Sequence, residues 1–268
     1  RDPLWSRGLG DVYKRQVLGW DDALAFTQAA DETGIPIILQ AGPSCRAHTP
    51  IPILGKMFRY LASQTKTNIC CHVDHGYTLD ECYEGIDSGF TSVMFDGSKL
   101  TLKENIKISK KIASRAHKYN ISIEGEIGFV GYDNGKISEG TNIEDAVTFA
   151  NKSNIDAMAI SVGNTHLQTS KKASIDFNKI NLIEAKTKIP LVLHGSSGIP
   201  VEQRKQLARK TKVAKLNIGT EIRMTFGEAL RKNLKNNPKT YDRLQLLKPT
   251  IKDLTKVTKK IIKQIGPN

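Results

Sequence analysis

The sequence predicts an α/β protein built as a (β/α)8 TIM barrel, on three observations. Short apolar runs rich in β-branched residues alternate with amphipathic helical patterns along most of the chain. The length of 268 residues suits a barrel, which typically needs about 250 residues. The sequence also has no glycine-rich motif of the GxGxxG or GxxxxGKS/T type, which disfavours the alternative of an open, doubly wound nucleotide-binding sheet.

Seven strands can be counted, and helical segments lie between them. The strands are expected at residues 35–39, 69–73, 92–95, 121–124, 157–162, 190–194 and 213–218. Helices are expected at residues 20–34, 78–89, 105–120, 142–154 and 200–211, several with Asp, Asn or Thr at the start and Gly or Asn at the end. Two strands that are joined by one helix lie parallel, and the connection between them is right-handed. An eighth strand before residue 17 would therefore close the barrel.

Residues 1–16 do not fit this pattern. Their apolar residues show no helical or strand periodicity, and they do not lead naturally into the following helix. They resemble the non-native residues that arise when the end of an assembled environmental DNA sequence is translated. We therefore exclude residues 1–16 as a non-native segment and assign the barrel domain to residues 17–268. The first strand of the barrel is then expected to be missing or replaced, which would expose two sheet edges.

The chain is basic, with a net charge of +13 from 40 Lys and Arg against 27 Asp and Glu. This balance fits a nucleic-acid-binding protein, an enzyme for anionic metabolites, or a lysine-rich surface. In residues 248–266, lysines interleave with apolar residues at helical spacing, as in an amphipathic helix with a solvated face. The lysine-rich surface is therefore favoured, and a non-catalytic barrel that binds nucleic acid is the least favoured alternative.

Four cysteines are present, at positions 45, 70, 71 and 82, without a CxxC pair. Cys70 and Cys71 would point to opposite faces of a strand, so they do not clip a metal together. Reduced thiols in a cytoplasmic protein are the expected state. No apolar stretch approaches the ~20 residues that a membrane span needs, so no membrane partner is expected.

Three histidines are the sharpest functional signal. His75 and His166 follow the strands at 69–73 and 157–162, and His194 ends the strand at 190–194. In a barrel, the carboxyl ends of the strands gather around one mouth, where barrel enzymes place their chemistry. Three histidines that converge there, with one position left for water or substrate, are typical of a catalytic zinc site.

Carboxyl groups surround these histidines in the sequence. Asp74 directly precedes His75, and a carboxylate beside a metal site is a candidate proton carrier. Asp96 ends another strand, and Glu124 and Glu126 end a third. The alternatives for these three are helix N-caps or hydrogen-bond partners of the ligand histidines.

Two glycine-rich segments follow the last two predicted strands. Residues 194–200, HGSSGIP, and residues 217–221, NIGTE, both lead into helices. Backbone N–H groups at a helix start favour a phosphate, and the loops after strands 7 and 8 of a barrel are its usual phosphate grip. The pair therefore predicts a phosphorylated ligand, with ordinary tight turns as the alternative.

Together these motifs resemble the class II fructose- and tagatose-bisphosphate aldolases from about residue 17 to residue 266. The resemblance is carried by residues 72–98, 123–128, 161–166, 190–200 and 215–221, which read HVDHGYTLDECYEGIDSGFTSVMFDGS, IEGEIG, SVGNTH, PLVLHGSSGIP and KLNIGTE. It implies a zinc-dependent carbon–carbon lyase that reversibly cleaves a ketose 1,6-bisphosphate to dihydroxyacetone phosphate and glyceraldehyde 3-phosphate. Zinc would stabilise the enediolate, and no Schiff-base lysine is then required. The resemblance also implies a homo-oligomer, either a dimer or a tetramer.

The resemblance assigns roles to particular residues. It makes Asp74 the acid/base on the aldehyde oxygen, and His75, His166 and His194 the ligands of the catalytic zinc. Asp96 and Glu126 match positions that bind a second divalent metal in some members. Dihydroxyacetone phosphate would be held by the segments Gly195, Ser196, Ser197, Asn217, Ile218, Gly219 and Thr220. Residues 128–142 match a loop that closes over the substrate.

Three departures from the family pattern concern the substrate. Leu167 stands where many relatives have a glycine that borders dihydroxyacetone phosphate and a monovalent cation. Gly42 stands where several relatives place a Ser or Thr on the aldehyde phosphate, and residues 237–239, NPK, replace an Asp-Pro-Arg of some members. An aldolase for a different phosphorylated ketose, as in sugar-alcohol or inositol catabolism, is therefore the alternative function.

Overall fold

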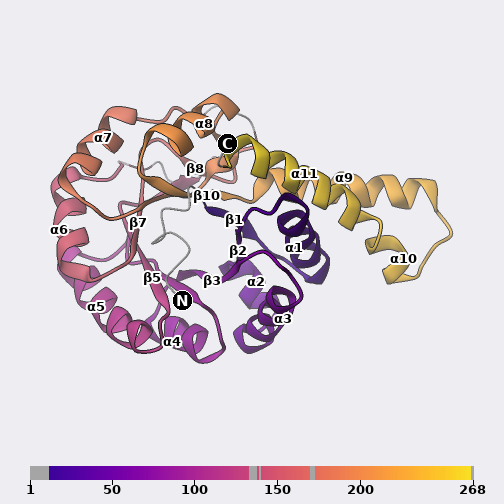
Figure 1. The fold of residues 1–268 in the computed structure, drawn as a ribbon, viewed down its shortest axis with the longest axis horizontal. Helices are drawn as coiled ribbons and strands as arrows, with labels where there is room; N and C mark the ends of the chain where they lie inside the picture. The colour runs from indigo at the N-terminus through magenta and orange to yellow at the C-terminus, as the bar shows by residue number, and fades with distance from the viewer. Residues whose placement is uncertain (1–11, 133–137, 139, 170–172, 267–268) are drawn as a thin grey trace.

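Eight parallel strands close into a barrel in the computed structural model, which describes residues 12–132, 138, 140–169 and 173–266. The prediction of a TIM barrel is thus confirmed, and Figure 1 shows the strands encircled by helices. Around the barrel the order is β1 (Val12–Gln16), β10 (Val213–Ile218), β9 (Leu191–Leu193), β7 (Ala157–Ile160), β5 (Ser122–Ile127), β4 (Ser92–Phe95), β3 (Ile69–Gly76) and β2 (Ile37–Ala41).

We expected the first strand to be missing or replaced, and the structure shows a strand that the excluded segment itself provides. The last five residues of the excluded segment form β1, in which Tyr13 lies opposite Leu216 of β10 on one side and Ile37 of β2 on the other. The physical reason is that seven strands would leave two edges with unpaired N–H and C=O groups. An extended segment joined directly to the first helix satisfies both edges. Residues 1–11 lie outside the described residues, and residues 12–16 of the excluded segment are part of the described barrel.

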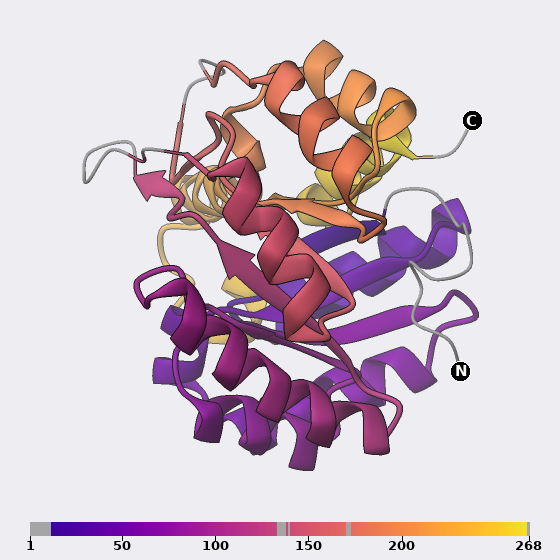
Figure 2. The same ribbon diagram turned by 90° about the vertical axis from the view of Figure 1, so that its left-hand side faces the viewer.

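Helices cover the outside of the barrel, as the view in Figure 2 also shows. They are α1 (Trp20–Thr33), α2 (Pro43–His48), α3 (Ile51–Ser63), α4 (Leu79–Asp87), α5 (Leu102–Lys118), α6 (Ile143–Ser153), α7 (Phe177–Lys186), α8 (Val201–Lys210), α9 (Thr220–Asn236), α10 (Arg243–Leu247) and α11 (Thr250–Ile265). Local sequence sets several of their ends. Thr101 and Glu104 form a capping box at the start of α5, and Gly34 ends α1 in the left-handed conformation.

The strands divide the apolar residues into two layers. The large core lies between the strands and the helices and includes Phe26, Phe58 and Phe149. Small clusters made only of strand residues, such as Ile38 with Cys70, fill the barrel interior. The four cysteines are buried free thiols, and Cys71 belongs to the outer core while Cys70 faces inward. This confirms that the adjacent pair points to opposite faces.

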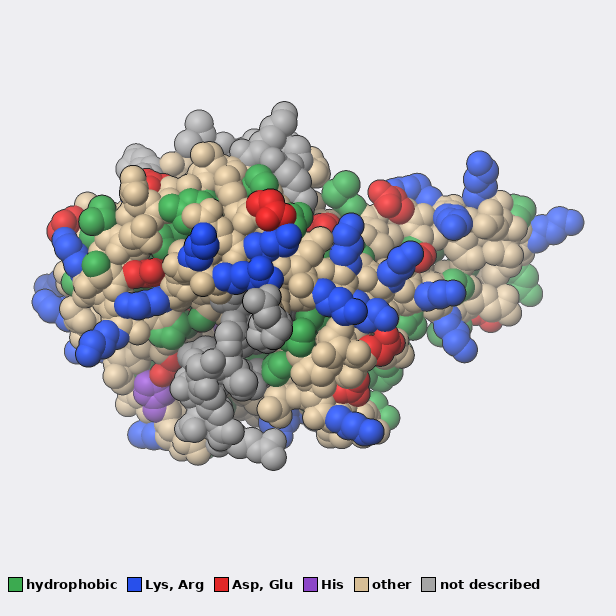
Figure 3. All heavy atoms as spheres, turned by 45° about the horizontal axis from the view of Figure 1, so that its top comes forward, with side chains coloured by type: hydrophobic (Ala, Val, Ile, Leu, Met, Phe, Trp, Pro, Cys, Tyr) green, Lys and Arg blue, Asp and Glu red, His purple; other side chains and the backbone are tan. Residues whose placement is uncertain are grey.

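The C-terminal part of the chain forms an arm beside the barrel. The far half of α9 and α10 project away from the strands in Figure 1, and α11 returns to pack against α1. In α11, Leu254, Ile261 and Ile262 are buried while the lysines lie outside, as expected for an amphipathic helix. Figure 3 shows Lys and Arg side chains scattered over this face and along the arm, mixed with acidic and apolar groups. Within the described ranges, no helix is both long and apolar enough to cross a membrane.

Candidate metal and phosphate site

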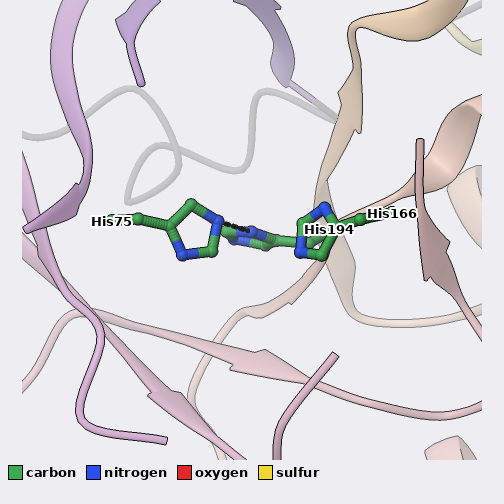
Figure 4. A group of neighbouring side chains, drawn as sticks. All are labelled: His75, His166 and His194. Carbon is green, nitrogen blue, oxygen red and sulfur yellow. Dashed lines mark hydrogen bonds between the residues drawn. The ribbon is translucent and has the colours of Figure 1, made fainter. Parts of the chain in front are cut away.

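The structure brings the three predicted histidines together at the carboxyl ends of the strands (Figure 4). His75 lies near the end of β3, His194 directly follows β9, and His166 lies on the short strand β8 (Thr165–His166). One nitrogen from each ring lies within 4.8 Å of one nitrogen of both others. The ring centroids of His75 and His194 are 4.5 Å apart, and that of His166 lies 5.5 Å from His75. This spacing fits three donors around one ion.

His166 reaches the site by a different route from the one predicted. It is not at the end of a barrel strand but on β8, which pairs with β6 (Gly131–Tyr132) outside the barrel. Asn164 ties this segment down, because its Nδ2 donates to the carbonyl of His194 at 3.0 Å. Gly195, at a φ of 61°, allows the close approach: a Cβ there would lie 2.3 Å from the carbonyl oxygen of Thr165.

A line of hydrogen bonds fixes the orientation of two of the rings. Glu124 Oε1 lies 2.9 Å from His194 Nε2, His194 Nδ1 lies 2.8 Å from His75 Nε2, and His75 Nδ1 lies 2.8 Å from Asp96 Oδ2. Glu124 is 1% exposed and also forms an ion pair with the ammonium group of Lys215. An ionised Glu124 accepts the Nε2 proton of His194, which leaves the Nδ1 lone pair of His194 facing the site.

The charges around His75 fit this arrangement. Burial alone would lower the pKa of His75, but Asp74 and the hydrogen-bonded Asp96 raise it to about 9. Burial likewise opposes ionisation of Asp96, yet the contacts with His75 lower its pKa to about 2. His75 Nε2 and His194 Nδ1 face each other at 2.8 Å, and a metal bound by both nitrogens would replace the proton of that hydrogen bond. Burial and the neighbouring rings lower the pKa of His166 to about 3, so this ring is a neutral donor.

The donor set fits zinc. Three imidazole nitrogens from three segments match the protein donors of catalytic zinc sites. Asp96 and Glu126 stand on the Nδ1 side of His75, where Glu126 Oε2 lies 3.7 Å from that nitrogen. With His75 they form a second group of donors within 4.8 Å of one another. Burial and the charge of Asp96 raise the pKa of Glu126 to about 8, and a cation beside it would favour its ionised form.

Asp74 lies beside this group and is 4% exposed. Gln40, at the end of β2, donates from Nε2 to Asp74 Oδ2 at 3.1 Å. Arg46 donates to the backbone carbonyls of Asp74 and of His75, the latter at 3.0 Å, and so clamps the end of β3. The sequence prediction missed both partners. A polar Gln that ends a buried apolar strand was the available signal for Gln40.

The two predicted phosphate segments are joined to each other. Ser197 Oγ accepts from the backbone N–H of Gly219 at 3.2 Å and from that of Thr220 at 3.1 Å. The fully buried Arg204 braces both loops, since its Nη2 donates to the carbonyl of Ser197 at 2.7 Å and to Glu221 Oε2 at 3.1 Å. Arg204 lies among the polar residues of a predicted helix, and the sequence therefore did not indicate that its side chain is buried between the loops.

Three other residues of the predicted grip have buried side chains. Ser196 turns its hydroxyl back to the carbonyl of Leu193 at 2.9 Å, and Ile218 is buried in the core. Asn217, near the end of β10, is 8% exposed. Within the predicted closing loop at residues 128–142, positions 133–137 and 139 lie outside the described residues.

Leu167 keeps the backbone conformation of a glycine. Its φ is 58°, and its side chain is 52% exposed. A left-handed conformation costs a residue with a Cβ about 1–2 kcal/mol. Leu167 therefore stores strain directly after the ring of His166.

Replacing Leu167 with glycine should relieve this strain. We expect Leu167→Gly to raise the free energy of unfolding by about 1 kcal/mol, measured by urea unfolding. The matched control is Leu182→Gly, because Leu182 is half exposed on the helix α7. That change should lower the free energy by about 1 kcal/mol. A loss of stability in Leu167→Gly equal to that in the control would contradict the strain.

Glu124 should control metal binding through His194. We expect Glu124→Gln to weaken zinc binding by about 10- to 100-fold, because the neutral amide no longer fixes the ring and its tautomer. Competition with a chromogenic chelator measures this affinity without any assay of activity. Glu202→Gln, at an exposed site on α8, is the control and should leave the affinity unchanged. Equal affinity in both variants would remove Glu124 from this role.

Comparison with known proteins agrees with this geometry. The family model described as fructose-bisphosphate aldolase class-II matches residues 12–268. The 6-phospho-5-dehydro-2-deoxy-D-gluconate aldolase of Shouchella clausii is 37% identical over 201 residues, which cover 74% of this chain and 68% of that protein. A fructose-bisphosphate aldolase of Staphylococcus aureus is 31% identical over 249 residues, covering 90% and 87%. The YdjI aldolase of Escherichia coli K12 has the same fold, with a TM-score of 0.85 at 23% identity over 99% of this chain and 97% of that one. The chain therefore belongs to the class II fructose-bisphosphate aldolase family.

Proposed function

We propose that this protein is a zinc-dependent aldolase that reversibly cleaves a phosphorylated ketose into dihydroxyacetone phosphate and an aldehyde. The first candidate substrate is a ketose 1,6-bisphosphate of the fructose or tagatose type, which would yield glyceraldehyde 3-phosphate. One observation carries the proposal. Three histidine donors, the carboxyl group of Asp74 and two joined loops at a helix start meet around one barrel mouth.

Each part of the mouth has a task in this reaction. His75, His166 and His194 would hold zinc, which when bound supplies Lewis-acid stabilisation of the negative charge that develops beside the ketose carbonyl. The loop containing Ser197 and the first turn of α9 would hold the phosphate of dihydroxyacetone phosphate through backbone N–H groups.

Asp74 would move the proton. In cleavage its carboxylate accepts the proton of the hydroxyl group on the carbon that becomes the aldehyde, and in condensation it returns that proton to the aldehyde oxygen. The hydrogen bond from Gln40 at 3.1 Å holds the carboxyl group at the mouth. The ion pair of Glu124 with Lys215, below the histidines, lies deeper in the barrel and orients His194 rather than the substrate.

A second candidate substrate is 6-phospho-5-dehydro-2-deoxy-D-gluconate. It is the substrate named for a relative with 37% identity, against 31% for the fructose-bisphosphate relative. Both candidates carry a phosphate at the end that becomes dihydroxyacetone phosphate, and they differ in the aldehyde half. A panel of the two substrates in a coupled cleavage assay separates them.

Loss of Asp74 or of the metal should abolish cleavage for different reasons. We expect Asp74→Asn to lower kcat by about 10²- to 10⁴-fold while the protein still binds zinc, because only the proton transfer is lost. Treatment with EDTA should remove both zinc and activity, and added zinc should restore them. Dihydroxyacetone phosphate release is measured by a coupled dehydrogenase, and zinc content by atomic absorption.

Two results would contradict these expectations. Full activity after EDTA, with no zinc detected, would rule out the metal-dependent reaction. Full activity in Asp74→Asn would leave the reaction class standing but assign the proton transfer to another group. Asp242→Asn, at an exposed position on the distant arm, is the matched control and should behave as the parent protein.

A further inference from the structure

In the proposed reaction, one sector of the barrel mouth supplies no group that binds the substrate or the metal. The histidines and Asp74 stand on β3 and after β7 and β9, and the phosphate grip follows β9 and β10. In the closed ring of strands, β1 and β2 lie between the grip and β3. A substrate held at its phosphate and at Asp74 has its aldehyde half beside Asp74, so the free end of that half extends over this sector.

The guanidinium group of Arg223 occupies this sector. Arg223 is in the first turn of α9, and its Nη2 folds back to within 3.5 Å of the position that a Cβ on Gly219 would take. The same Nη2 donates to the side-chain carbonyl of Gln16 at the end of β1. The amide nitrogen of Gln16 lies 2.5 Å from the Cβ position of Gly42, and that position lies 3.7 Å from Asp74 Oδ2. A single amide group therefore separates the guanidinium from the acid/base.

The contacts of Arg223 do not fully offset the unfavourable burial of its guanidinium group. Burial lowers the pKa of Arg223, and the charges of Asp22 and Asp74 act in the opposite direction. Among the described residues, its buried Nε has no hydrogen-bond partner. A guanidinium has five N–H donors, and burying such a group is costly unless those donors are used. An anion that enters the mouth would use them.

We propose that Arg223 binds a carboxylate group at the end of the aldehyde half of the substrate. This proposal rests on the proposed aldolase function and selects the sugar acid from its two candidate substrates. The planar guanidinium fork matches a carboxylate through two parallel N–H···O bonds. Charge balance points the same way: one guanidinium already faces two carboxyl groups, Asp22 and Asp74. A phosphate would add about −1.5 to −2 charges to this sector, whereas a carboxylate adds one.

The test compares three aldehydes in condensation with dihydroxyacetone phosphate on the zinc-loaded protein. They are 3-oxopropanoate, which carries a carboxylate, D-glyceraldehyde 3-phosphate and uncharged D-glyceraldehyde. We expect Arg223→Gln to lower kcat/KM for 3-oxopropanoate by about 10- to 100-fold, the loss of hydrogen bonds to a charged group. The value for D-glyceraldehyde should change little. Arg223→Lys should recover part of the loss, because it keeps the charge without the fork.

Controls separate this role from a structural one. Arg231→Gln, about two turns further along α9 and exposed, should leave all three reactions unchanged. An equal loss with all three aldehydes, or a raised KM for dihydroxyacetone phosphate, would overturn the proposal. A larger loss with glyceraldehyde 3-phosphate than with 3-oxopropanoate would also overturn it, since the ligand would then be a phosphate. If Arg223→Gln does not fold, Arg223→Lys must still lose preference for 3-oxopropanoate over D-glyceraldehyde. Failure of the parent protein to condense any aldehyde would instead contradict the aldolase function itself.

Discussion

A continuous line of hydrogen bonds runs through the barrel mouth from Glu124 through His194 and His75 to Asp96. An imidazole ring has two nitrogens, and the partner of one decides whether the other donates or accepts. Carboxylates at both ends of the line hold the outer nitrogens, so the two inner nitrogens face each other at 2.8 Å. Zinc bound by both inner nitrogens would replace the proton of this hydrogen bond. His166 lies next to this line, with its ring centroid 5.5 Å from that of His75, and Asp74 directly precedes His75 on β3.

The barrel holds this line of hydrogen bonds in place, although burying its charged groups is energetically unfavourable. Glu124 and Lys215 are both almost fully buried, and buried charges are tolerated only when they are paired. Strain is also concentrated here, since His75 and Leu167 adopt positive φ angles of 49° and 58°. Paired charges and strained residues held by a rigid scaffold are common at sites where geometry must be set before the ligand arrives. The scaffold does this through Arg46, which clamps the end of β3, and through the buried Arg204, which joins the two phosphate loops.

Much of the barrel could be predicted because its pattern is local. Strands β4 and β10 fall on the predicted bounds, and β3 runs on to Gly76. The first strand could not be predicted, because Val12–Gln16 has no apolar period and pairs only because the ring leaves a gap there. Helices α2 and α3 were also missed, since each begins at or beside a proline rather than at a polar cap.

Some features of the site could also be predicted from local sequence, and others could not. The meeting of three histidines could be predicted, since parallel strands bring their carboxyl ends together. A hydrogen bond from Glu124 to a ligand histidine was one of the alternatives that the sequence left open. The ion pair of Lys215 could not be predicted, because alternation along a strand does not tell the inside of a barrel from its outside. The position of Arg223 at the mouth could not be predicted for another reason. A cation in the first turn of a helix is usually solvated, and only the folding back of its side chain over β10 distinguishes this one.

The zinc site is tested most directly by a crystal structure of the zinc-loaded protein, with the metal located by anomalous scattering at the zinc edge. We expect one zinc bound by nitrogens of His75, His166 and His194 at about 2.0–2.1 Å, with His194 bound through Nδ1 while its Nε2 stays on Glu124. Zinc bound by Asp96 and Glu126 without His194, or by His194 through Nε2 with Glu124 displaced, would contradict this arrangement.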